Sequence, residues 1–118
     1  MNISSLDFQQ ARIKLVVFKS RLRSMLYGVR EAEPALFSVR DNPFGQWLAA
    51  TLTPRFGPVA EVRGIERALG QMLRHGQELL ALYRQGHIER ARAGLEQIDA
   101  YAAEIEALLQ RLEVQNAA

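Results

Sequence analysis

Apolar residues recur at steps of three and four along most of this chain, which is the spacing that places them on one face of an α-helix. The first such row, between residues 5 and 27, is Ala11, Leu15, Phe18, Leu22 and Met25. The second row, between residues 59 and 84, is Val62, Ile65, Leu69, Leu73, Gly76, Leu80 and Tyr83. The third row, between residues 88 and 112, is Ala91, Leu95, Ile98, Ala102, Ile105, Leu109 and Leu112. The pattern therefore predicts three long amphipathic helices.

Capping and turn residues predict where these helices begin and end. Asp7, followed three residues later by Gln10, has the form of a capping box at the start of the first helix. Gly28 follows that helix, and Gly86 follows the second long helix; a glycine after the last turn is a common helix stop. The long helices are therefore expected at Ser5–Tyr27, Val59–Arg84 and Ile88–Leu112.

A shorter helix is expected between the first two of these. Asn42 is a good capping residue, and Pro43 fits the first helical position, where its missing N–H is not needed. The short helix should run from Phe44 to about Thr51 and end before Pro54, while residues 29–41 form a connection. Because no stretch alternates apolar and polar residues as a strand would, we predict an all-α fold. It is a four-helix bundle with one short helix, in a single domain over residues 1–118.

Glycines inside the predicted helices indicate close helix packing. A turn at Gly86 makes the last two helices antiparallel, which places Gly76 near Gly94 and Gly70 near Ala102. Small residues that face one another let two helices approach closely. We expect tight packing here, with a groove for a ligand as the alternative.

Composition narrows the class of protein. The chain has no cysteine, which excludes disulfides and thiolate ligands. Its net charge is +2, and its arginines are scattered rather than clustered with exposed aromatic residues, so we expect no nucleic-acid binding. No apolar run approaches the roughly 20 residues that span a bilayer, and residues 1–5 do not have the pattern of a signal peptide. We therefore expect a cytoplasmic protein without membrane insertion.

Candidate catalytic and metal-binding residues are few. His75 lies off the predicted core row and His87 lies in a turn, with no cysteines or clustered carboxylates near them in the sequence. A histidine phosphotransfer domain is also a helical bundle with an exposed histidine, but the residues after His75 lack the Lys-Gly pair typical of that class. The serines have no partnered base. We predict no enzyme activity and no cofactor, and keep phosphotransfer at His75 as an alternative.

A more specific arrangement of residues runs through nearly the whole chain. It consists of Asp7-Phe8, Phe18-Lys19-x-Arg21-Leu22, Leu26-x-Gly28, Asn42-x-Phe44-Gly45-Gln46-Trp47-Leu48 and Phe56-Gly57. A long helix up to Gly86 and a final amphipathic helix follow. This arrangement resembles the bacterial chemoreceptor zinc-binding (CZB) domain, a four-helix bundle found on chemoreceptors and diguanylate cyclases.

The resemblance implies four metal-ligand positions. In the family, zinc is bound by a His three residues before a Trp-Lys pair, by the Cys of a Cys-x-Leu-Gly-Lys-Trp motif, and by a His-x-x-x-His pair in the third helix. In this sequence the four positions hold Leu15, Asn42, Leu69 and Leu73, and Phe18 stands where the Trp usually does. All four ligands are absent, so the resemblance implies a degenerate member without a metal site.

The resemblance also implies a role in signal transduction, chemotaxis being one setting, without the zinc or hypochlorous-acid sensing of the intact family. We expect a non-catalytic interaction module that binds another signalling protein or forms a homodimer. The alternative is a small-molecule sensor that uses the former metal pocket. A cavity among Leu15, Leu69 and Leu73 would favour that sensor, and a tightly filled cluster would favour the interaction module.

Overall fold

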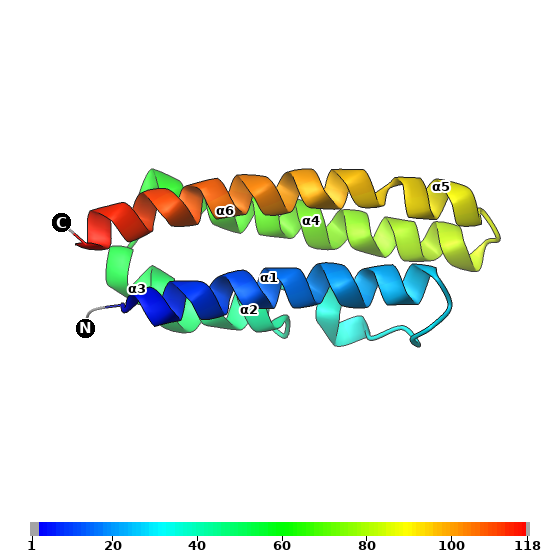
Figure 1. The fold of residues 1–118 in the computed structure, drawn as a ribbon, viewed down its shortest axis with the longest axis horizontal. Coiled ribbons are helices and arrows are strands. Elements are labelled where there is room, and N and C mark those ends of the chain that lie inside the picture. The colour runs from blue at the N-terminus through cyan, green and yellow to red at the C-terminus, as the bar shows by residue number, and fades with distance from the viewer. Residues whose placement is uncertain (1–2, 118) are drawn as a thin grey trace.

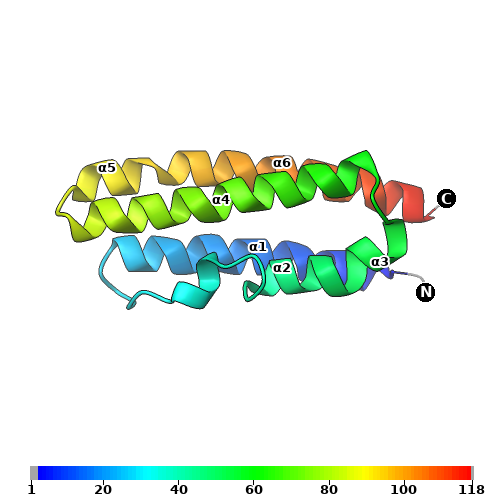
Figure 2. The ribbon, with the colours of Figure 1, turned by 180° about the vertical axis from the view of Figure 1, so that it is seen from behind.

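The computed structural model describes residues 3–117, and every regular element within that range is helical. The elements pack side by side as four rods in an elongated bundle of 49 × 20 × 20 Å (Figures 1 and 2). In chain order they are α1 Ser5–Leu26, a 3₁₀ turn Pro34–Phe37 (η1), α2 Pro43–Trp47, a π-helical turn Leu48–Leu52 (η2), α3 Thr53–Phe56, α4 Ala60–Arg84, α5 Ile88–Ala93 and α6 Leu95–Ala117. The prediction of an all-α four-helix bundle with one shorter helix is confirmed.

Neighbouring rods alternate in direction. Side chains of α5 and α6 reach α1 at both ends: Arg92 Nε donates to the Leu26 carbonyl at 2.9 Å, and Asn116 Nδ2 donates to the Ile3 carbonyl at 2.6 Å. The first and third rods are parallel. A Cβ atom at Gly76 would lie 3.4 Å from Leu22 Cδ2, so each residue of α1 lies level with the residue of α4 about 54 positions later.

The core includes most residues of the predicted apolar rows, together with apolar residues of η1, α2 and η2 and others on α1 and α4. All five residues of the α1 row are buried, as are the α4 row up to Leu80 and most of the last row, while Leu95 and Tyr83 are half-buried.

The predicted end of α4 at Gly86 is also confirmed, and φ at this glycine is 91°. There the His87 amide donates to the Leu82 carbonyl at 2.9 Å, which is the hydrogen bond of a Schellman motif. Within residues 3–117 no helix has an apolar stretch long enough to cross a bilayer.

The capping box of α1 lies three residues before the predicted one. Ser4 is the capping residue; its Oγ accepts from the Asp7 amide at 3.1 Å, and the Asp7 carboxylate accepts from the Ser4 amide at 2.8 Å. The prediction that Asp7 and Gln10 form the box is therefore wrong. Asp7 does belong to a capping box, but it holds the third helical position rather than the capping one.

The second rod continues past its predicted end. Pro54 was expected to stop it, but the rod runs through η2 and α3 to Phe56. The Thr53 amide donates to the Leu48 carbonyl five residues back, the bond of a π turn. A proline ring clashes with the carbonyl four residues before it in a regular α-helix, and the wider turn accommodates the ring.

The last rod is interrupted at Gly94, where α5 ends and α6 begins. A side chain at Gly94 would collide with Leu79 of α4, so the close approach there is of glycine to leucine. Gly76 instead packs against Phe37 and Leu22, and Gly70 has open space where its Cβ would be. The antiparallel register is as predicted, but the pairing of small residues across it is wrong.

Candidate functional site

Asn42, which the resemblance would align with the Cys of the CZB motif, is buried, and its side chain makes three hydrogen bonds to the backbone. Its side chain is 1% exposed. Its Oδ1 accepts from the amides of Phe44 at 2.9 Å and Gly45 at 3.2 Å, and its Nδ2 donates to the Leu36 carbonyl at 2.7 Å. Asn42 therefore caps α2 and also ties that helix to η1.

The turn around Asn42 leaves no room for a larger residue at Gly45. A Cβ atom there would overlap the carbonyl oxygen of Val39. Beyond the turn, Trp47 packs against Phe44 with ring centroids 5.8 Å apart and against Phe8 of α1 at 6.1 Å. The glycine and the tryptophan of the motif thus have packing roles that need no metal.

The other three positions that the resemblance assigns to metal ligands are core. Leu15, Leu69 and Leu73 are 3%, 0% and 1% exposed, and all belong to the single hydrophobic core of the bundle. The α1–α4 register derived from Gly76 and Leu22 puts Leu15 level with Leu69. Leu73 follows one helical turn later on the same face.

The donor set at these four positions does not fit zinc. Zinc is bound in proteins by thiolate, imidazole and carboxylate groups, whereas leucine side chains have no lone pair to offer. The amide oxygen of Asn42 already accepts two backbone hydrogen bonds. Elsewhere within residues 3–117, no three His, Asp or Glu side chains gather closely enough to hold a metal ion.

His75 is more enclosed than its position off the core row predicts. Its side chain is 25% exposed and lies between α4 and α6. Its Nε2 is 3.3 Å from the Gly94 carbonyl oxygen, and its ring meets the Tyr101 ring edge-on at 6.3 Å. The ring nitrogen Nε2, which faces the break in the last rod, therefore lies within hydrogen-bonding distance of a backbone carbonyl. His87 is exposed at the start of α5 and makes no side-chain capping bond.

The outer face of α1 carries exposed aliphatic residues that were not predicted from the sequence. Leu6, Ile13 and Val17 are 60%, 60% and 36% exposed, and their spacing puts them in one row on the side of the helix opposite the core. Val16, 59% exposed, lies beside this row toward α6. The helix is thus apolar on two sides, and one of them is not covered by the bundle. Counting exposed aliphatic residues at helical spacing would have found this row.

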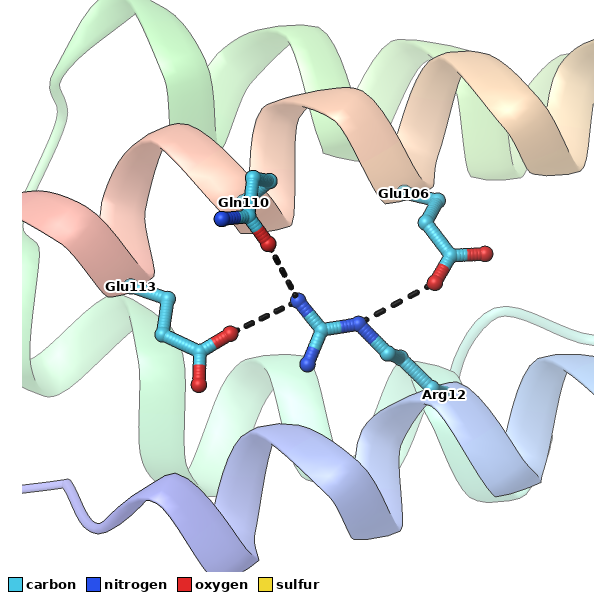
Figure 3. A network of polar contacts seen from close by, with 4 residues as sticks. All are labelled: Arg12, Glu106, Gln110 and Glu113. Carbon is cyan, nitrogen blue, oxygen red and sulfur yellow. Dashed lines mark hydrogen bonds and ion pairs between the residues drawn. The ribbon is translucent and has the colours of Figure 1, made fainter.

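Basic residues lie on both sides of the row, and on one side acidic residues of α6 pair with them. Arg12 Nε lies 3.0 Å from Glu106, and Arg12 Nη2 lies 2.7 Å from Glu113 and donates to Gln110 at 3.2 Å (Figure 3). Lys19 lies 3.5 Å from Asp99. On this side, α6 therefore contacts α1 through ion pairs between its acidic residues and the basic residues of α1.

The opposite border, toward η1 and α2, contains a notch. It measures about 200 Å³ and has an apolar floor that includes Phe18 and Leu36. Its remaining lining residues are Ile13, Lys14, Val17, Arg21 and Pro43. Residues 43–56, which form the neighbouring rod, include no Asp or Glu. Within residues 3–117 no acidic side chain pairs with Lys14, and Arg21 has only Glu33, at 3.6 Å.

Comparison of the chain with protein-family models, with curated proteins and with solved structures finds no match.

Proposed function

We propose that this chain is a non-catalytic interaction module of a bacterial signalling system, and that it binds another signalling protein through the outer face of α1. The observation that carries the proposal is the exposed row of Leu6, Ile13 and Val17. Exposed aliphatic residues scattered singly are ordinary on protein surfaces, whereas apolar patches rimmed by polar residues are typical of protein-binding sites. Ile13 and Val17 lie one helical turn apart on this face, and Leu6 lies two turns before Ile13. Here the row adjoins an apolar notch.

The proposal includes the resemblance to the CZB domain. On this view the chain is a sensor scaffold, working in the cytoplasm, whose metal centre has been replaced by core. The burial of Leu15, Leu69 and Leu73 supports this view, as does the use of Asn42 as a helix cap. Such a module transmits no metal signal of its own, so its contribution to signalling is the contact that it makes.

Site-specific cross-linking in the native cell tests the proposal. A photo-reactive benzoylphenylalanine in place of Ile13 should give one dominant adduct, cross-linked to a defined segment of another protein, and Val17→Asp should abolish it. The same cross-linker in place of Val114, which is 59% exposed near the end of α6, is the matched control and should give no such adduct. Equal adduct patterns at the two positions would contradict the proposal. Adducts between two copies of this chain would show instead that the outer face of α1 forms a homodimer.

A further inference from the structure

The two borders of the exposed row on α1 differ in how their positive charge is compensated. Toward α6, Arg12 and Lys19 have carboxylate partners within the chain. Toward α2, Lys14 has no acidic partner within residues 3–117, and Arg21 has Glu33 at 3.6 Å. Both residues flank an apolar notch beside a rod, residues 43–56, that contains no Asp or Glu. The border toward α6 is therefore covered by a helix with acidic residues. The border toward α2 has an apolar notch and, at Lys14, a positive charge without an acidic partner, and no acidic helix covers it.

We infer that the notch border of α1 binds an amphipathic helix of the partner protein, with one large apolar side chain in the notch and acidic residues on either side of it. The inference rests on the proposed function and names the chemistry of the partner. Its basis is charge complementarity, because charged groups across an interface are arranged so that a positive patch meets a negative one. A helix seated in a groove by spaced anchors is a common mode of peptide recognition.

The spacing of the two basic residues fixes the spacing of the acidic ones. Lys14 and Arg21 are seven residues apart, which is about 10.5 Å along α1 at a rise of 1.5 Å per residue. A partner helix that runs alongside can match both with carboxylates seven residues apart, and the apolar anchor then lies three or four residues from each. The notch of about 200 Å³ is large enough for the side chain of a leucine or an aromatic residue.

The chain itself contains a related contact, in which acidic residues seven positions apart on one helix meet a single basic residue of α1. Glu106, Gln110 and Glu113 of α6 stand at positions i, i+4 and i+7, and all three contact Arg12 of α1 (Figure 3). A partner helix with a similar acidic edge would cover the other border of α1 in the same way. It would also cover Ile13 and Val17, which are exposed between the two borders.

Selection from a library of displayed helical peptides on the purified full chain tests the inference. Enriched peptides should have two acidic residues seven positions apart on either side of a large apolar residue. On the double variant Lys14→Glu/Arg21→Glu the enriched pattern should invert to basic residues, and the best acidic peptide should bind about tenfold more weakly, roughly 1.4 kcal/mol. The charge-matched control Arg63→Glu/Arg67→Glu, on two exposed arginines of α4, should leave both the pattern and the affinity unchanged.

The outcomes separate this inference from the proposed function. If Ile13→Asp abolishes peptide binding but the enriched charge pattern does not invert, α1 is a docking face and the acidic-helix inference is wrong. If Ile13→Asp leaves binding unchanged, both are wrong. A dimer of the chain that Ile13→Asp dissociates in sedimentation experiments would assign the face to a second copy and would also overturn the inference.

Discussion

The substitution Asn42→Ala removes one buried side chain that stabilises two segments at once. It leaves the amides of Phe44 and Gly45 without their acceptor, which for an N-cap asparagine costs about 1 kcal/mol. It also leaves the Leu36 carbonyl without its donor in a buried environment, at about 1–3 kcal/mol. The free energy of unfolding should therefore fall by roughly 3 kcal/mol, and the Tm by about 12 °C at roughly 4 °C per kcal/mol for a chain of this length.

Chemical and thermal unfolding followed by circular dichroism measures this loss. Gln46→Ala is the matched control, because Gln46 lies on the same turn with an exposed side chain, and it should change stability by less than about 0.5 kcal/mol. Asn42→Ser keeps an oxygen acceptor for the cap but loses the donor to Leu36, so its loss should be intermediate. A loss at Asn42→Ala no larger than that at Gln46→Ala would refute the account of this turn.

Three further substitutions test the core, the turn and the ion-pair cluster. Leu69→Ala should lower the free energy of unfolding by about 2–5 kcal/mol in urea because it opens a cavity in a fully buried site, whereas Leu6→Ala on the exposed face should change it by less than about 0.5 kcal/mol. Gly45→Ala should abolish the cooperative thermal transition or lower its midpoint more than Asn42→Ala does, since its Cβ would overlap backbone rather than a movable side chain. Arg12→Ala should cost about 1–2 kcal/mol in dilute buffer and less in 1 M salt, a difference that the same urea titration at two salt concentrations would detect.

The sequence predicts those parts of the fold that follow from local spacing. The rows that include Leu15 and Leu69 repeat every three or four residues because one side of each helix is buried, so the helices and their core faces can be identified without coordinates. Asn42 followed by Pro43 predicts a helix start for a reason that is also local, and the structure has the cap at that position.

Features that depend on other parts of the chain were not predictable in the same way. Pro54 lies inside the second rod, in the first turn of α3 and directly after a π turn, and nothing at Pro54 itself indicates that turn. The break at Gly94 depends on where Leu79 of α4 lies, and the enclosure of His75 depends on Tyr101 of α6. Each is a consequence of packing between rods, which a helical repeat does not specify.

The candidate site also has some features that follow from local spacing and others that depend on packing between rods. The burial of Leu73 follows from its place in a helical row, but the pairing of Arg12 with Glu106 joins residues far apart in sequence. The exposed row on α1 was available in the sequence as aliphatic residues opposite the core. Whether another rod covers that row depends on packing, and in the structure Ile13 is exposed to solvent.

On the proposed resemblance to the CZB domain, four buried positions, now leucine and asparagine, are the counterparts of a metal centre that has become core and cap. Restoring the family's ligands tests it most directly, with the quadruple variant Leu15→His, Asn42→Cys, Leu69→His and Leu73→His. The measurement is the zinc content of the purified variant together with its thermal unfolding with and without a chelator. We expect about one zinc ion per chain and a folded state that the chelator destabilises, because metal binding and folding are coupled at such sites. A folded variant that retains no more zinc than the parent chain would contradict the claim, and so would an unfolded variant that equimolar zinc does not refold.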